Sequence, residues 1–136
     1  MVKSLNEQKD KLFLFCINCQ SLNSHWDHFN SLLESITDET FAFDVIGITE
    51  IFQIHSNINY DVTGYHPLHY STRTGVSSGR GGVGMYIKDH VNVEQRPDIS
   101  VFIPHVFQSL FIEISGKHQT IIIGTIYRPN TPPKAD

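Results

Sequence analysis

The chain has 136 residues, of which 40% are hydrophobic and 18% charged, a composition typical of a folded globular domain and not of a disordered chain. This length suits one domain at most. The net charge of −4 argues against a protein that coats nucleic acid through clustered cations. It does not argue against a metal-dependent nuclease, because such a site is itself acidic and the bound cation restores positive charge locally.

The first ten residues are polar and predict a lead-in before a domain that spans residues 11–136. They contain no apolar core of a signal peptide. The longest apolar run, Leu12–Ile17, is too short to cross a bilayer. From the sequence we therefore expect an intracellular protein, nuclear or cytoplasmic, with reduced cysteines.

Three apolar runs predict strands that are covered on both faces, and each ends on a residue that could do chemistry. They are Lys11–Asn18, Asp44–Glu50 and His118–Tyr127. In layered α/β proteins, polar residues just past strand ends converge on one rim, where sites are built. An amide, an acid and a phenol brought together in this way indicate a site for a metal and an oxyanion.

A helix is predicted between the first two of these strands, with Asn23 or Ser24 as its cap. Its apolar residues fall on one face, namely Trp26, Phe29, Leu32, Leu33 and Ile36. Thr37–Glu39 ends the helix before the second strand. A strand–helix–strand unit of this kind places its strands parallel in one sheet.

The second half of the chain predicts further strands, turns and loops. We expect a loop or short helix over Gln53–Gly64, strands over Tyr65–Ser71 and Val83–Lys88 around the loop Thr72–Gly82, and strand and loop over Val91–Ile103. Phe107–Ser115 alternates, with Leu110, Ile112 and Ile114 on one face. Gly116-Lys117 predicts a two-residue type II′ hairpin turn into the last strand.

The sequence does not support three common kinds of site: a dinucleotide-binding loop, a zinc finger and a serine hydrolase elbow. Gly79–Gly84 reads G-x-G-x-x-G, but a strand and not a helix is expected after it, so we interpret it as a glycine hinge. Cys16 and Cys19 precede His25 and His28 at a spacing too short for a zinc finger, and Cys16 is expected to be a small buried hydrophobe. No Gly-x-Ser-x-Gly elbow supports a serine hydrolase.

Each of the three strand-end residues also has an ordinary structural explanation, and for Tyr127 it is a strand-end aromatic that simply packs. Glu50 is a candidate ligand of Mg²⁺ or Mn²⁺, since hard cations prefer oxygen, or else an ordinary solvated glutamate. Asn18 is a candidate donor to an oxyanion, or else a turn-forming asparagine.

Five segments occur in the order and approximate spacing of one known family. They are Cys16–Leu22, Asp44–Glu50, Gly81–Lys88, Gln108–Glu113 and Gly124–Asn130. From Lys11 to Pro133 the chain resembles the first part of an endonuclease/exonuclease/phosphatase domain, and more narrowly that of non-LTR retrotransposon endonucleases. The resemblance implies the N-terminal part of an α/β fold, a partial two-sheet sandwich like that of deoxyribonuclease I.

The resemblance also implies roles for individual residues. Glu50 would bind Mg²⁺ or Mn²⁺, Asn18 would lie near the metal and the scissile phosphate, and Tyr127 would hydrogen-bond the phosphate or its neighbours. DNA would be the substrate. Arg80 and Arg128 are candidates for contact with its backbone, although the loop that contains Arg80 is also typical of a solvated segment.

Two motifs of that family, Gly-Asp-Phe-Asn and Ser-Asp-His, do not occur in this sequence, and Gln20 and Gln108 depart from the residues common in relatives. We therefore expect the N-terminal part of a Mg²⁺-dependent phosphodiesterase domain, with weak metal binding and little or no activity by itself. An unfinished sheet would leave apolar surface for self-association. The alternatives are a non-catalytic α/β remnant or protein-interaction module, and a phosphatase of the same superfamily.

Overall fold

The computed structural model describes residues 11–38, 41–71 and 81–129, which form a mixed α/β arrangement of one helix and two sheets. The elements in chain order are β1 (Leu14–Asn18), α1 (Trp26–Ile36), β2 (Val45–Thr49), β3 (His69–Tyr70), β4 (Val83–Ile87), β5 (Asn92–Gln95), β6 (Phe102–Ile103), β7 (Phe107–Ser115) and β8 (Thr120–Tyr127). The predicted mixed α/β class with two sheets is confirmed.

The first sheet has the strand order β1-β2-β4-β3. β1 and β2 are parallel, with Leu14 opposite Val45 and Asn18 opposite Thr49, and α1 provides the crossover between them. The strand–helix–strand unit expected from the sequence is therefore present. β4 runs antiparallel to β2, so Val83 at its start lies opposite Thr49 at the end of β2.

The second sheet is built around β7. β8 pairs with β7 along its length, from Ser115 opposite Thr120 to Gln108 opposite Tyr127. β5 and β6 pair with opposite ends of β7. β8 itself crosses β2 and β4 of the first sheet, and this crossing holds the sheets face to face.

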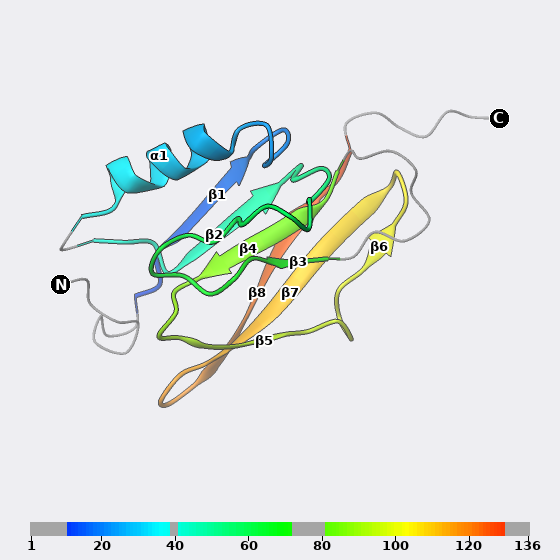
Figure 1. The fold of residues 1–136 in the computed structure, drawn as a ribbon. Helices are drawn as coiled ribbons and strands as arrows, with labels where there is room; N and C mark the ends of the chain where they lie inside the picture. Colours follow the sequence, from blue (N-terminus) through cyan, green and yellow to red (C-terminus); the bar gives the residue numbers. More distant parts are fainter. Residues whose placement is uncertain (1–10, 39–40, 72–80, 130–136) are drawn as a thin grey trace.

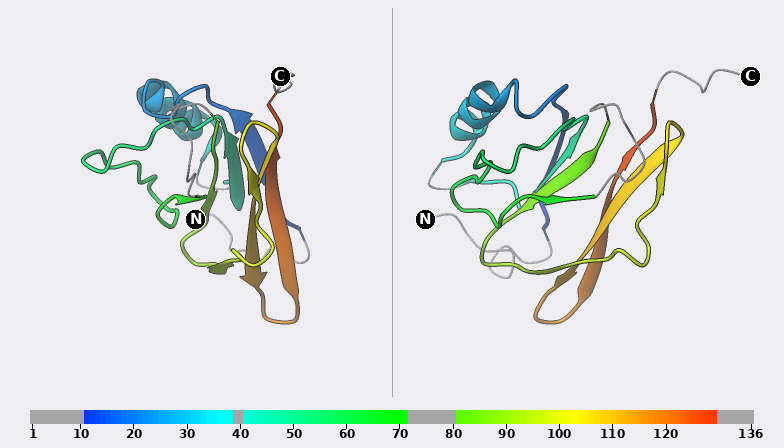
Figure 2. Two further views of the ribbon diagram at one scale, coloured as in Figure 1. Left: turned by 90° about the vertical axis from the view of Figure 1, so that its right-hand side faces the viewer. Right: turned by 45° about the vertical axis from the view of Figure 1, so that its right-hand side comes forward.

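Three layers result, as the left view of Figure 2 shows: α1 with the green segment between β2 and β3, then the first sheet, then the second. One apolar core lies between α1 and the first sheet and includes Phe29, Leu33 and Ile48. A second lies between the sheets and includes Met85 and Ile112. Every residue of β2 and β4 is buried, as expected for strands covered on both faces.

Two of the three strands predicted to be covered on both faces are not. The outer face of β8 is exposed at Ile122 and Ile126. β1 is the edge strand of its sheet. Its residues alternate between exposed and partly buried, and the Leu14 side chain is 55% exposed. Cys16 lies on the same exposed face, so the expectation that it is buried was wrong. Cys19 is the buried thiol, and burial raises its pKa to about 11.

The helix begins later than the proposed caps imply. Trp26 is its first residue and His25 precedes it, without a side-chain capping bond. Ser21 organises the entry instead, because its Oγ accepts a hydrogen bond from the Ser24 backbone N–H at 3.1 Å. The prediction that Asn23 or Ser24 caps the helix was wrong.

Two strand boundaries also differ from the predictions. Within Tyr65–Ser71 only His69–Tyr70 is strand. The hairpin between β7 and β8 spans residues 116–119, and Gly116 is not among the glycines with positive φ, so the type II′ turn was wrong. The Gly116 N–H instead donates to the Gln119 carbonyl at 2.8 Å. Across the described ranges no helix has the length and apolar character needed to cross a membrane.

Candidate functional site

Three strands finish at one end of the molecule (Figure 1). β1 and β2 are parallel and end at Asn18 and Thr49, with Glu50 next in the chain. β8 ends at Tyr127, close to the same end of β2. The sequence-predicted residues Asn18, Glu50 and Tyr127 thus share one rim, which we call the strand-end rim.

Glu50 and Tyr127 are in direct contact there. The Tyr127 hydroxyl donates a hydrogen bond to Glu50 Oε1 at 2.8 Å, across 77 residues of chain. Burial raises the pKa of Tyr127 to about 12, and the bond to Glu50 and the negative charge of Glu50 add to this effect. The phenol is therefore protonated at neutral pH and acts as a hydrogen-bond donor.

The backbone around Glu50 is strained and held by its neighbours. Glu50 has φ 54° and Phe52 has φ 59°, both in the left-handed region that non-glycine residues seldom adopt. The Glu50 carbonyl accepts from the Ser21 N–H at 2.8 Å, and the Phe52 N–H donates to the Gly81 carbonyl at 2.8 Å. These bonds fix the direction in which the carboxylate leaves β2.

Asn18 lies on the exposed face of β1. Its Oδ1 accepts a hydrogen bond from the Gln20 N–H at 3.2 Å, which is the bond that an asparagine in a turn commonly makes. Gln20 and Ser21 follow with φ 44° and 86°. Asn18 lies opposite Thr49, one residue before Glu50, but the described contacts do not join its side chain to Glu50 or Tyr127.

Backbone strain is concentrated at this rim. In the described part of the chain five non-glycine residues have positive φ, and Gln20, Ser21, Glu50 and Phe52 are four of them. Each such conformation costs on the order of 1–3 kcal/mol and persists only where its surroundings determine it. Strain of this kind clusters at binding and catalytic sites, so it independently marks the two strand ends.

Gln108 belongs to the rim but was not predicted as a site residue. It lies opposite Tyr127 on β7 and is only 3% exposed. Its Oε1 accepts from the Gly82 N–H at 3.0 Å, and its Nε2 donates to Ser71 Oγ at 2.5 Å. The sequence did carry a signal, because Gln108 is the polar member of an otherwise apolar inward face that continues with Leu110.

The rim offers some of the oxygen ligands that a hard cation such as Mg²⁺ requires, but not a full set. A carboxylate has about four acceptor positions, so the Tyr127 bond leaves Glu50 with capacity for a metal, and Asn18 Oδ1 likewise has a second lone pair. Among the described residues no group of three or more histidine, cysteine, aspartate or glutamate side chains could hold a metal ion. Mg²⁺ tolerates few protein ligands because it retains waters and binds substrate phosphate.

The remaining predicted residues are placed as follows. Arg80 lies outside the described residues. Arg128 is exposed and directly follows Tyr127. Gly81 and Gly82 have φ 84° and 98° and lead into strand β4 and not into a helix, which agrees with a glycine hinge and not a dinucleotide site.

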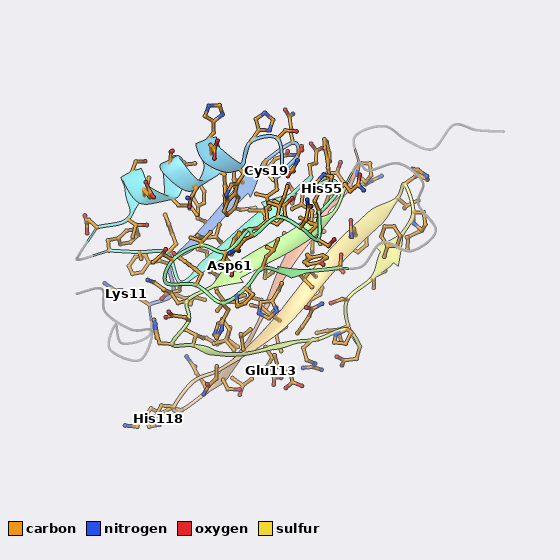
Figure 3. All side chains as sticks on the ribbon, in the orientation of Figure 1. Lys11, Cys19, His55, Asp61, Glu113 and His118 are labelled. Carbon is orange, nitrogen blue, oxygen red and sulfur yellow. The ribbon has the colours of Figure 1, made fainter. Side chains whose placement is uncertain are left out.

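Other reactive side chains differ in how close they lie to the strand-end rim. Figure 3 shows His118 at the tip of the β7–β8 hairpin, remote from the strand-end rim, and Glu113 along β7. Glu113 pairs with Arg96 at 2.9 Å, and Arg96 also binds Asp98. Cys19 is near the rim in Figure 3, and its buried Sγ lies 3.3 Å from the Thr49 carbonyl and 3.7 Å from the Glu50 carbonyl.

Comparisons with known proteins add no family assignment. No family model matches the chain, and a search of curated proteins found no match either.

Proposed function

We propose that this chain carries the first part of a Mg²⁺-dependent phosphodiesterase domain with a deoxyribonuclease-I-like fold, related to the endonucleases of non-LTR retrotransposons. The complete site would hydrolyse a phosphodiester of DNA. The observation that carries the proposal is the 2.8 Å hydrogen bond from Tyr127 to Glu50, since it joins two sequence motifs that the resemblance assigns to one site. The strained backbone at Glu50 is independent support.

Each rim residue has a role that its chemistry permits. Glu50 would hold the divalent ion with one carboxylate, with Asn18 Oδ1 as the second oxygen donor. The bound ion would supply charge neutralisation at the phosphate and a more acidic water. Tyr127 has one hydroxyl proton, which would orient Glu50 in the free site and would be donated to the phosphate once substrate is bound. Because its pKa is about 12, it would not serve as a general base near neutral pH.

Substrate contact would extend from the rim along the exposed chain. Arg128 follows Tyr127 directly, and an exposed guanidinium there suits a DNA backbone phosphate. Arg80, in the loop Thr72–Gly82 predicted from the sequence, is the second candidate. Changing Arg128 to Gln should weaken DNA binding uniformly across sequences, because phosphate contacts position DNA without reading its bases.

We expect the 136-residue chain to be a weak catalyst. The sequence contains neither the Gly-Asp-Phe-Asn nor the Ser-Asp-His motif whose side chains would orient the attacking water. Catalysis of this type requires several groups in position at once. Mg²⁺ held through Glu50 and Asn18 alone should therefore bind weakly and promote little hydrolysis.

Calorimetry and plasmid nicking test the proposal together. Mn²⁺ and Mg²⁺ are titrated into the protein, and supercoiled plasmid is incubated with each ion, for the parent, Glu50→Ala and the control Glu94→Ala. Glu94 is an exposed carboxylate on β5. The proposal predicts weak saturable Mn²⁺ binding that is lost only in Glu50→Ala, and any nicking should follow the same pattern. Equal binding in Glu50→Ala would contradict it.

A protein-interaction module is the second candidate, and one observation favours it. Large apolar side chains are exposed along the second sheet and the segment before β7: Ile99, Val101, Ile103, Val106, Ile122 and Ile126. Ile126 is 56% exposed. Contiguous exposed apolar surface commonly marks a protein contact. This reading predicts self-association or partner binding that persists when Glu50 is changed.

A further inference from the structure

Gln108 is a buried polar residue whose strand partner is Tyr127, the residue that hydrogen-bonds Glu50. It lies on β7 opposite Tyr127, and both side chains belong to the face of the second sheet that meets the first. With 3% of its surface exposed, its amide needs partners, because an unpaired buried amide costs about 1–3 kcal/mol.

The partners fix the orientation of the amide. The Gly82 backbone N–H can only donate, so the atom facing it at 3.0 Å must be Oε1. Nε2 then points to Ser71 Oγ, which accepts. The Gln108 side chain thus joins β7 of the second sheet to two residues beside the first sheet: Ser71, directly after β3, and Gly82, directly before β4.

Gly82 connects this amide to the backbone that follows Glu50. Its carbonyl accepts from the Ile51 N–H at 3.4 Å, and the adjacent Gly81 carbonyl accepts from the Phe52 N–H at 2.8 Å. The path from Gln108 therefore runs through Gly82 to Ile51, the residue next to Glu50. Glu50 has φ 54° and depends on these neighbours to remain in that conformation.

We propose that Gln108 is a positioning residue of the strand-end rim: through Gly82 it holds the backbone after Glu50, and through β7 it holds β8, so that the Tyr127 hydroxyl meets Glu50. The positioning itself is a property of the fold. Only its consequence for metal binding rests on the proposed function. Residues that orient a metal ligand in this manner commonly change metal affinity about 10–100-fold when they are altered.

Gln108→Leu and Gln108→Glu separate positioning from general stability. Leucine removes both hydrogen bonds and leaves the Gly82 N–H buried without its partner. Glutamate keeps an oxygen facing Gly82, and the Ser71 hydroxyl can turn to donate to it, so the geometry should be restored. Ser109→Ala is the matched control, because Ser109 is equally buried on β7 but its Oγ accepts from Val101, away from the rim.

The primary readout is NMR of the parent and variants labelled with ¹³C at the Glu carboxyl and Tyr ring carbons. The Glu50 and Tyr127 signals are assigned with Glu50→Gln and Tyr127→Phe. Gln108→Leu should shift the Glu50 signal toward its position in Tyr127→Phe, and the Tyr127 signal toward its position in Glu50→Gln. Gln108→Glu and Ser109→Ala should leave both signals near the parent values. If Gln108→Leu fails to fold, Ser71→Ala removes one of the two bonds without changing the core and should shift the same signals by a smaller amount.

Mn²⁺ affinity is the second readout. Gln108→Leu should lower it about tenfold and Ser109→Ala should not. Absence of Mn²⁺ binding in the parent would remove the proposed function but leave the positioning role to be decided by the carbon shifts. Glu50 and Tyr127 signals unchanged in both Gln108→Leu and Ser71→Ala would overturn the inference.

Discussion

Changing Gly47 to alanine tests the crossing of the two sheets, on which the strand-end rim depends. Gly47 is the middle residue of β2, and β8 passes over it. A Cβ added there would lie 2.7 Å from Thr125 Oγ1 and 3.6 Å from Thr125 Cγ2. Because 2.7 Å is shorter than contacts of real Cβ atoms, either Thr125 must rotate or the sheets must move apart.

The cost follows from how little room Thr125 has. It is 6% exposed and lies between the sheets, so its displacement disturbs the core. Overpacking of this kind typically destabilises a protein by about 1–3 kcal/mol. Gly124→Ala gives a contrast on β8 itself. Its added Cβ would meet the Phe111 ring more closely still, but that ring is on the outer face and can move away.

Urea unfolding of a double-mutant cycle provides the assay. Gly47→Ala should lower the free energy of unfolding by about 2 kcal/mol, and more than Gly124→Ala does. Thr125→Ala, which removes Oγ1 and Cγ2, should be destabilising alone and stabilising in the Gly47→Ala background, with a coupling energy of about 1–2 kcal/mol. Additive effects, or a Gly47→Ala variant as stable as the parent, would refute the sheet crossing described above.

Three further outcomes are expected. A thiol reagent at pH 8 should modify one cysteine quickly, because Cys16 is exposed whereas burial raises the pKa of Cys19 to about 11. Cys16→Ser should remove this fast phase. A second thiol that reacts equally fast would contradict the prediction. The pKa of Tyr127 is raised to about 12, against about 10 in the unfolded chain, so this group's stabilisation is complete below pH 10 and is lost as pH rises through 12. Alkaline unfolding of Tyr127→Phe should therefore be less steep than that of the parent. Identical profiles would argue against a partly buried phenol bonded to Glu50. Light scattering should show concentration-dependent self-association that Ile126→Lys reduces and Ile58→Lys, on the loop beside α1, does not; a monomeric parent would contradict it.

The buried strands were the most predictable part of the fold. The run that contains β2 is apolar at consecutive positions, and the run that contains β7 alternates, so each pattern indicates how many of its faces are covered. The helix between β1 and β2 then determines that those strands are parallel. Because parallel strands end at one edge, Asn18 and Glu50 could be expected at the same rim.

The exposed face of β1 could not be predicted in the same way. Leu12–Ile17 is apolar throughout and predicts burial on both sides, but burial of Cys16 requires a strand of the second sheet opposite it. β8 lies over β2 and β4, while β1 extends beyond them as the edge strand. Which strand of one sheet faces which strand of another is not encoded in the pattern of a single segment.

Sequence patterns could not predict the hydrogen bonds of the strand-end rim either. The motif order suggested that Glu50 and Tyr127 belong together, but the bond between them depends on how far β8 extends and on the positive φ of Glu50. Gln108 contacts Gly82 and Ser71, which are 26 and 37 residues away. Only the three-dimensional structure shows that one amide serves both partners.

Paramagnetic NMR with Mn²⁺ tests the central claim most directly, namely that the strand-end rim holds a divalent cation through Glu50 beside Tyr127. Substoichiometric Mn²⁺ should selectively broaden the Tyr127 ring signals and the Asn18 side-chain amide signals, and excess Mg²⁺ should reverse the effect. Glu50→Ala should abolish the broadening and Glu94→Ala should not. Broadening that survives in Glu50→Ala, or that centres on residues away from the rim, would contradict the account.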